Sequence, residues 1–325
     1  MKEEDIRPSG VFDEFLRLAA EDVGHYFSDA PRVDCLCPAC GGAGQDAFSK
    51  SGFNYRLCSA CETLYVSPRP VADAFSKYYR ESASANYWAS TFYRETAEAR
   101  RQKLWAPKAR QVHDMLSSLE GPAYAVVDIG GGYGIFAEEY AKVAGSEVLI
   151  IEPGPCLAAE CLSRGLRVVE AFLETVGPDA LPSGPRAFVS FELFEHLHSP
   201  EAFVSHLQRL MAPGDLFFFT TLSGRGLDIQ VLWKDAKAVS PPHHLNFFNP
   251  KSIRVLFSRL GFEILRVETP GKLDMDILKN NLPSIHDRFW RSVVQNSTES
   301  DLQCWQASIA ERGWSSHMLT LVRKI

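Results

Sequence analysis

The chain has 325 residues, of which 46% are hydrophobic and 23% charged, and its formal net charge is −6. These values are typical of a soluble globular protein with a sizeable core, and they exclude a disordered or fibrous chain. The acidic balance disfavours nucleic acid as a partner, because nucleic-acid binders gain most of their affinity by neutralising phosphates. No apolar run approaches the roughly eighteen residues of a membrane span, and the acidic start lacks a signal-peptide core, so we expect a cytoplasmic protein without membrane contact.

The first two segments of the chain differ in character. Residues 1–34 carry apolar side chains at helical spacing between positions 11 and 27, which predicts a helical lead-in. Residues 35–70 contain five of the eight cysteines, all between positions 35 and 61. Such clustering indicates a metal-binding module, whereas a disulfide set would be spread through a short secreted chain.

Two CxxC pairs, Cys37 with Cys40 and Cys58 with Cys61, are separated by seventeen residues. This spacing is typical of a zinc site in which four thiolates complete a tetrahedral shell. Four thiolates leave no open position on the ion, so we expect structural zinc; catalytic or redox use, and no metal at all, are the alternatives. Cys35 is a second candidate for the place of Cys37.

Residues 71–120 are rich in aromatic side chains and helical in pattern, and we expect them to form a lid or linker. From 121 to 325, short apolar runs alternate with helical stretches, which predicts an α/β fold with a doubly wound sheet. Residues 271–315 interrupt the strand pattern and predict a helical insertion. The predicted strands are 124–129, 147–151, 166–169, 187–191, 215–222, 262–269 and 316–323, and the helices between them lie near 134–144, 155–164, 200–211 and 250–260.

A glycine-rich loop follows the first of these strands. The sequence Asp128-Ile-Gly-Gly-Gly-Tyr-Gly134 has the spacing GxGxG, and glycine lets the backbone turn sharply and approach a ligand at a helix N-terminus. A dinucleotide fingerprint would place glycine at Ile135, which disfavours a nicotinamide enzyme. Glu152 ends the second strand, where a carboxylate can accept both hydroxyls of a ribose, a feature common to both classes.

These motifs resemble the class I S-adenosylmethionine-dependent methyltransferases over about residues 120–325. The Glu-His-Leu segment and the later His-His-Leu-Asn-Phe-Phe segment resemble the ubiquinone-biosynthesis-like subgroup. A four-cysteine module ahead of such a domain is similar to the sugar C-methyltransferases. The resemblance implies a Rossmann-like seven-stranded sheet whose last strand is antiparallel. The matching segments, in order, are 126–134, 150–153, 191–197, 211–215 and 261–263.

The resemblance also implies which residues bind the cofactor. The glycine loop would wrap the methionine part with Asp128 as support, and Glu192 at the end of the fourth strand would face the cofactor. The lid would contribute a tyrosine, Tyr87, to the methionine carboxylate, although aromatic residues at this spacing are also typical of core. The full set implied is Asp128, Gly130, Gly132, Gly134, Glu152, Pro153, Glu192 and Tyr87.

An acceptor that starts neutral must lose a proton, and histidine is the side chain whose pKa lies nearest working pH. His244 and His243 follow a Pro-Pro pair, and His196 follows the fourth strand. The resemblance to the sugar C-methyltransferases, matched on the Leu-x-aromatic-Phe that follows, places His244 on the last histidine of their His-Glu-His stretch. We expect His244 as the base, with His196 and His243 as alternatives. A structural role for His244 in positioning the following helix cap is the competing interpretation.

The leading hypothesis is therefore a methyltransferase that acts on a small molecule, with a sugar or nucleotide-sugar as the favoured acceptor of a C- or O-methylation. The alternative is an enzyme that methylates protein or RNA and is recruited through its zinc module. Lys50 and Arg56 are the only basic residues between the two CxxC pairs. So few positive charges disfavour RNA as the acceptor and leave protein open.

Overall fold

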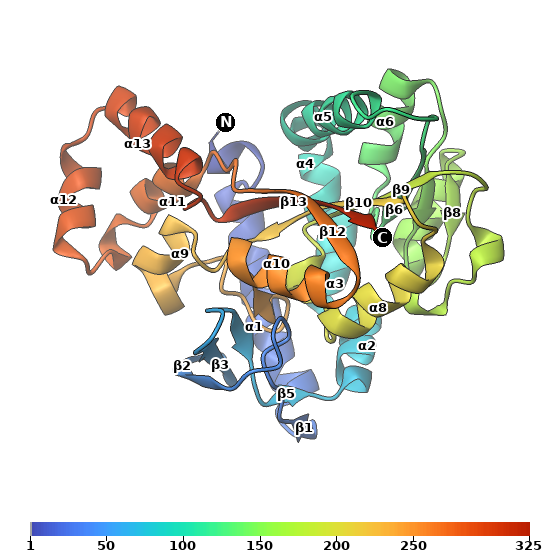
Figure 1. Cartoon of the computed structure of the whole chain (residues 1–325). Helices are drawn as coiled ribbons and strands as arrows, with labels where there is room; N and C mark the ends of the chain where they lie inside the picture. Colours follow the sequence, from blue (N-terminus) through green and yellow to red (C-terminus); the bar gives the residue numbers. More distant parts are fainter. Residues whose placement is uncertain (1) are drawn as a thin grey trace.

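A seven-stranded sheet forms the centre of the computed structural model, which describes residues 2–325 (Figure 1). The strand order is β12-β13-β10-β9-β6-β7-β8, and only β13 runs antiparallel to its neighbours. The strands are β6 (Ala125–Ile129), β7 (Leu149–Ile151), β8 (Arg167–Val169), β9 (Arg186–Phe191), β10 (Leu216–Leu222), β12 (Phe262–Glu268) and β13 (His317–Lys324).

The central strands are apolar on both faces because helices cover both sides of the sheet. All seven residues of β10 are buried. Helices α5, α6 and α7 cover one face, where Val112 and Phe136 pack with Val189. Helices α8 and α10 cover the other face, where Leu207 and Phe257 pack with the sheet. These helices are α5 (Ala106–Ser117), α6 (Ile135–Ala144), α7 (Pro155–Ser163), α8 (Pro200–Leu210) and α10 (Pro250–Arg259).

Helices make up much of the chain before the central sheet. Helix α1 (Ser9–Phe27) buries Phe12 and Phe15 against Phe92, and it crosses the middle of the molecule in Figure 1. Two π-helical turns, 88–92 and 101–105, interrupt the helices that follow. Those helices are α2 (Ala72–Glu81), α3 (Ala83–Tyr87) and α4 (Tyr93–Arg100).

Residues 35–70, which we call the cysteine segment, supply most of a second, smaller sheet with the order β11-β4-β3-β2. One of its strands, β11, comes from the loop after β10, so residues 35–70 do not complete this sheet alone. Cys37, Cys58 and Cys61 also lie in the same apolar cluster as Val127 and Phe217 of the central sheet. The strands are β2 (Gly44–Lys50), β3 (Phe53–Cys58), β4 (Leu64–Val66) and β11 (Asn246–Phe247), and a separate pair joins β1 (Arg32–Val33) to β5 (Arg69–Pro70).

The predicted helical insertion lies between β12 and β13. It comprises α11 (Asp274–Asn280), α12 (Arg288–Asn296) and α13 (Glu299–Glu311), and α11 packs near α9 (Leu227–Leu232). Figure 1 shows α12 and α13 at the end of the molecule opposite β8.

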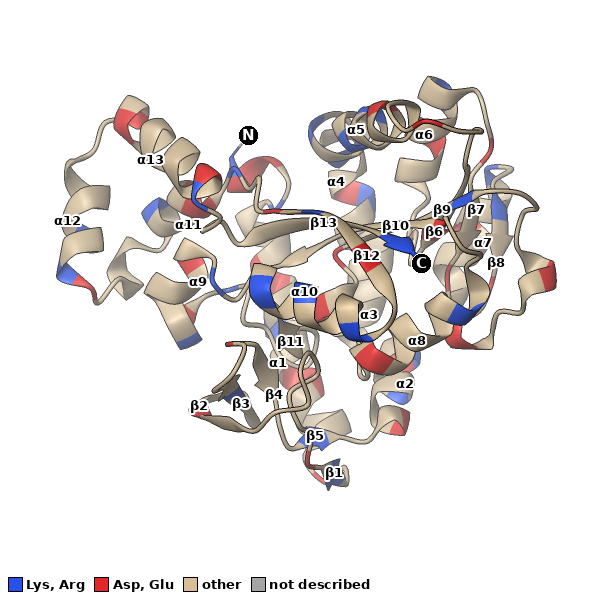
Figure 2. Cartoon of the chain, viewed as in Figure 1, with Lys and Arg blue, Asp and Glu red and all other residues tan. Residues whose placement is uncertain are grey.

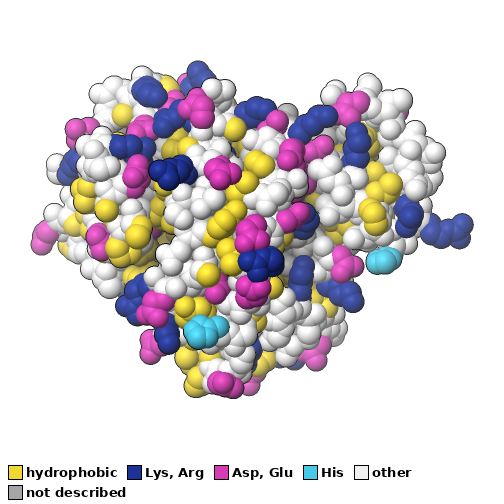
Figure 3. Space-filling view, turned by 180° about the vertical axis from the view of Figure 1, so that it is seen from behind, with side chains coloured by type: hydrophobic (Ala, Val, Ile, Leu, Met, Phe, Trp, Pro, Cys, Tyr) yellow, Lys and Arg dark blue, Asp and Glu magenta, His cyan; other side chains and the backbone are white. Residues whose placement is uncertain are grey.

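Charged side chains of both signs are interspersed along the fold (Figure 2) and on the face seen in Figure 3. None of the helices within residues 2–325 combines the length and apolar character that a membrane span requires.

Candidate active site and cysteine centre

The glycine loop joins the carboxyl end of β6 to the start of α6. Gly130 and Gly134 have φ angles of +72° and +68°, a region that side chains with a Cβ rarely adopt. A Cβ on Gly134 would also lie 2.6 Å from Leu166 and 2.9 Å from Cys161. Glycine is therefore required both for the turn and for the close approach of the loop to α7.

Two carboxyl groups meet behind this loop. The Glu152 side chain accepts hydrogen bonds from the backbone N–H groups of Gly132 at 2.9 Å and Gly154 at 2.8 Å, across Pro153. Asp128 is 1% exposed, and neither of its oxygens has a hydrogen-bond partner among the described residues. Burial, reinforced by the charge of Glu152, raises the pKa of Asp128 to about 8. A buried carboxyl without a hydrogen-bond partner, next to the backbone of the glycine loop, fits a ligand that carries hydrogen-bond donors.

The tyrosine beside the glycine loop is Tyr93 rather than Tyr87. Tyr87 packs against the aromatic cluster that Phe12 and Phe15 of α1 form with Phe92. The Tyr93 hydroxyl, in contrast, lies 3.2 Å from where a Cβ on Gly132 would stand. Tyr93 also stacks on Tyr133 of the loop at 5.1 Å between ring centroids. The π-helical turn 88–92 lies between the two tyrosines, so a regular helical period does not relate their positions.

Glu192 lies where β9 ends and has a φ of +53°, a strained angle for a residue with a Cβ. Its carboxylate accepts a hydrogen bond from Thr220 Oγ1 at 2.7 Å and lies 3.3 Å from Nδ1 of His317. Burial alone would raise the pKa of Glu192, but His317 and Thr220 hold it well below its usual range. His317 was not predicted from the sequence, because it reaches this edge only through the antiparallel pairing of β13 with β10.

The three predicted histidines form one group, which we call the histidine group. The ring centroid of His196 lies 4.7 Å from that of His244 and 6.1 Å from that of His243. Glu195 adjoins them, so that one polar atom each of Glu195, His196 and His244 falls within 4.8 Å of the others. The group lies at the carboxyl ends of the strands, beside Glu192, where ligands bind in doubly wound sheets.

Hydrogen bonds distinguish the members of the histidine group. His243 is buried, and its Nε2 is 2.7 Å from the Tyr78 hydroxyl. His244 Nδ1 is 2.5 Å from the carbonyl of Ala238 and must carry the proton there, which leaves Nε2 as an acceptor. Burial lowers the pKa of His243 to about 3 and that of His244 to about 4, and it raises the pKa of Glu195 to about 8. Neutral imidazoles therefore face a neutral carboxyl at physiological pH.

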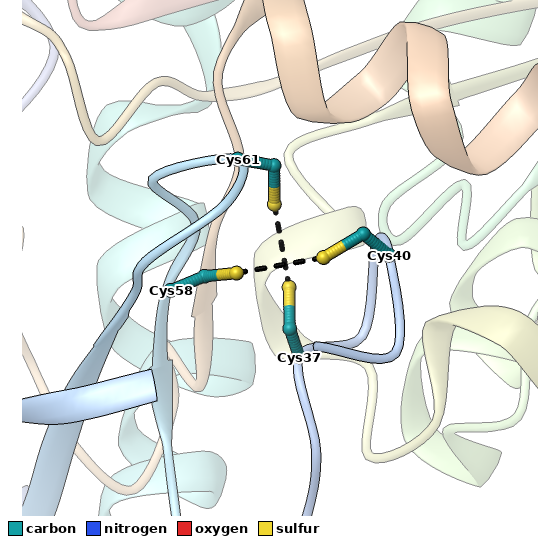
Figure 4. A group of neighbouring side chains, drawn as sticks. All are labelled: Cys37, Cys40, Cys58 and Cys61. Atoms are coloured by element: carbon teal, nitrogen blue, oxygen red, sulfur yellow. Dashed lines mark hydrogen bonds between the residues drawn. The ribbon is translucent and has the colours of Figure 1, made fainter. Parts of the chain in front are cut away.

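The four cysteines of the CxxC pairs converge on one point (Figure 4), with all four sulfurs within 4.8 Å of one another. The sulfur of Cys37 lies 3.4 Å from that of Cys61, and the same distance separates Cys40 and Cys58. A zinc ion with bonds of about 2.3 Å in a tetrahedron requires sulfurs about 3.8 Å apart, and a disulfide about 2.05 Å. The residues thus fit zinc. Cys35 stands outside the group, and its backbone N–H donates to Ser67.

The cysteine segment also contacts the loop that carries His243 and His244, which we call the histidine loop. The Tyr55 hydroxyl of β3 donates to the carbonyl of His244 at 2.7 Å, and β4 pairs with β11, which begins two residues after that histidine. Asn249 Nδ2 donates to the carbonyl of Cys61 at 2.9 Å, while its Oδ1 caps α10. Hydrogen bonds from the cysteine segment therefore link the Asn249 cap of α10 to the backbone of His244.

A family model described as "Methyltransferase domain" matches residues 91–267, which is more than half of the chain. The chain belongs to this methyltransferase family. Membership accounts for the Rossmann-like seven-stranded sheet and makes the protein a methyltransferase. The match begins in the π-helical turn 88–92, just before α4 and thirty residues before the boundary predicted at 121, so it includes the helix that carries Tyr93.

Several solved structures are similar to this methyltransferase. Magnesium protoporphyrin IX methyltransferase from Synechocystis PCC 6803, with bound S-adenosylhomocysteine, is 14% identical with a TM-score of 0.48, covering 74% of this chain and 97% of that one. Geranyl diphosphate C-methyltransferase from Streptomyces coelicolor A3(2) is 14% identical with a TM-score of 0.45, covering 72% and 85%. A SAM-dependent methyltransferase from Archaeoglobus fulgidus is 15% identical with a TM-score of 0.46, covering 71% and 100%. No curated protein matches the sequence.

Proposed function

We propose that this protein transfers a methyl group from S-adenosylmethionine to a small-molecule acceptor, with a sugar or nucleotide-sugar as the favoured class. The observation that carries the proposal is the position of the histidine group, which adjoins the carboxyl edge of the sheet where the glycine loop and Glu192 also lie. Methyl donor and proton acceptor would then be brought together by neighbouring strand ends.

The residues of the glycine loop and its surroundings would hold the cofactor. S-adenosylmethionine supplies a methyl group on a positively charged sulfur. Glu152 would accept the ribose hydroxyls while it fixes Gly132, and the orphaned Asp128 would accept donors from the methionine end. Tyr93 takes the place that the sequence assigned to Tyr87. Glu192, kept ionised by His317 and Thr220, would favour the positive charge.

His244 is the proposed base. Its Nδ1 proton is engaged by the Ala238 carbonyl, so Nε2 carries the lone pair that would take a proton from the acceptor as the new bond to the methyl group forms. His243 uses Nε2 to contact Tyr78 and is better suited to a positioning role. His196 lies against His244 and is the alternative base.

A small acceptor is favoured over a macromolecule by the placement of the cysteine segment. Its sheet includes β11, and three of the four cysteines of the CxxC pairs are buried in the main core, so it is not a free recruiting module. We propose that the predicted segments 1–34, 35–70, 71–120 and 121–325 fold as one unit on this basis. The zinc ion would then stabilise the histidine loop rather than bind a partner.

Titration calorimetry with S-adenosylhomocysteine and with NAD tests the cofactor, and micromolar binding of the former alone is expected. Release of S-adenosylhomocysteine in the presence of a panel of nucleotide-sugars, sugars and peptides then tests the acceptor. In that assay His244→Ala should lower turnover by roughly 10²- to 10⁴-fold with nearly constant cofactor affinity. Loss of cofactor binding in this variant would instead indicate a structural role, and unchanged turnover would move the base to His196.

A further inference from the structure

Two arginines from distant parts of the chain meet beside the proposed active site. Arg100 of α4 donates through Nη1 to the carbonyl of Ile6 at 3.4 Å, which places its guanidinium beside the backbone that leads into Arg7. After burial, the charge of Arg7 adds to the lowering of the pKa of Arg100. Aromatic rings support both cations: Arg7 lies 5.5 Å from the ring centroid of Phe12, and Arg100 lies 5.5 Å from that of Tyr93. Each contact orients a guanidinium plane without neutralising its charge.

Neither arginine has a carboxylate partner within residues 2–325. The contrast with neighbouring basic residues is direct, because Arg101 pairs with Glu138 and Glu139 at 2.6 Å and Lys103 pairs with Asp5 at 2.6 Å. Nε of Arg100 is buried and has no hydrogen-bond partner among the described residues. A half-buried cation beside a second cation, neither of them in an ion pair, is costly unless an anion binds there.

The arginine pair lies between the two halves of the site. On one side, Tyr93 joins Arg100 to Gly132 of the glycine loop. On the other side, Phe12 stacks on Phe15, and the ring of Phe15 lies 5.0 Å from that of His243. The charge of Arg7 contributes to the lowered pKa of His244, after burial, which is consistent with the same proximity.

We propose that Arg7 and Arg100 form a binding site for an anionic group of the acceptor, a phosphate or a carboxylate. The proposal rests on the proposed function and extends it, because it makes an anion an essential part of the acceptor. Two guanidinium groups offer planar, bidentate donors that match an oxyanion. The anion would hold the rest of the acceptor between the glycine loop and Nε2 of His244.

The test uses inorganic pyrophosphate for a phosphate source and acetate for a carboxylate source. Each is titrated calorimetrically into the full chain, with and without saturating S-adenosylhomocysteine. We expect one of them to bind, and Arg7→Gln and Arg100→Gln each to weaken that binding at least tenfold. Arg110→Gln is the matched control, since Arg110 is exposed on α5 and forms no ion pair among the described residues, and its affinity should equal that of the unaltered chain.

Three outcomes would overturn the proposal. The first is that neither anion binds although S-adenosylhomocysteine does, which leaves the proposed function intact. The second is binding that Arg7→Gln leaves unchanged, which indicates an adventitious anion site. The third is that pyrophosphate and acetate fail to bind, while Arg100→Gln weakens the binding of S-adenosylhomocysteine. In that outcome the same variant leaves the binding of 5′-methylthioadenosine, which lacks the carboxylate, unchanged. The pair would then hold the cofactor. Absence of S-adenosylhomocysteine binding in the unaltered chain would refute the proposed function itself.

Discussion

Replacing Glu152 by alanine is expected to weaken S-adenosylhomocysteine binding by about 10- to 150-fold. Glu152 is 6% exposed, and its two oxygens already accept the N–H groups of Gly132 and Gly154. Each carboxylate oxygen retains a further lone pair for a ribose hydroxyl. A charge-assisted hydrogen bond contributes about 1.5 to 3 kcal/mol, and about 1.4 kcal/mol corresponds to a factor of ten. Glu152→Gln should fall between, because its amide nitrogen cannot accept from a backbone N–H.

Titration calorimetry measures the affinity, and thermal unfolding shows whether the variant remains folded. Glu170→Ala is the matched control, because Glu170 directly follows β8, the next strand of the sheet, but is exposed and lies outside the glycine loop. A folded Glu152→Ala variant whose affinity stays within threefold of the unaltered chain would refute the assignment of Glu152 to the cofactor. Comparable weakening by Glu170→Ala would refute the specificity of the argument.

The remaining predictions concern metal, pH and the histidine loop. Purified protein should hold one zinc per chain by metal analysis, and Cys58→Ser should lose that ion and melt at a lower temperature; a second ion would lie at the histidine group, and no metal would contradict the assignment. Burial and the charge of Asp274 raise the pKa of Asp228 to about 8. Between about pH 4 and pH 8 the folded chain therefore holds a proton on Asp228 that the unfolded chain releases. The free energy of unfolding falls as pH rises through this range. Asp228→Asn should therefore raise the melting temperature more at pH 8 than at pH 5, and an equal gain at both would refute this. Tyr55→Phe leaves the carbonyl of His244 without its donor and should cost about 1 to 3 kcal/mol in urea unfolding without changing S-adenosylhomocysteine affinity; unchanged stability would refute the link.

Local sequence patterns were sufficient for most of the fold. The predicted strands begin and end within two residues of the observed ones, because each apolar run is bounded by turn residues. The α10 start at Asn249 and Pro250 was also predicted, since a cap is a contact between near neighbours in sequence. The spacing of the two CxxC pairs likewise predicted the cysteine group, although its sulfurs come from pairs that are 18 or more residues apart.

The parts of the site that sequence could not supply depend on contacts between distant segments. His317 faces Glu192 only because β13 pairs with β10 in one particular register, with Leu222 opposite His317. Tyr93, rather than Tyr87, lies beside the glycine loop, and the π-helical turn 88–92 between them means that a regular 3.6-residue period does not relate the two positions. No pattern within either segment carries this information.

The cysteine segment shows the same dependence at a larger scale. Its spacing predicts a zinc module, but its place in the sheet is set by β11, which follows the predicted base by two residues. Arg69 is buried, and its guanidinium donates hydrogen bonds to the carbonyl of Val66 and to Asn246 of β11. A charged side chain of the cysteine segment thus fixes that strand. Because a buried cation needs partners for its donors, Arg69 links the position of the cysteine segment to that of β11 and the histidine loop. Zinc in this methyltransferase would thus act on catalysis through the position of His244, without any contact with the reacting groups.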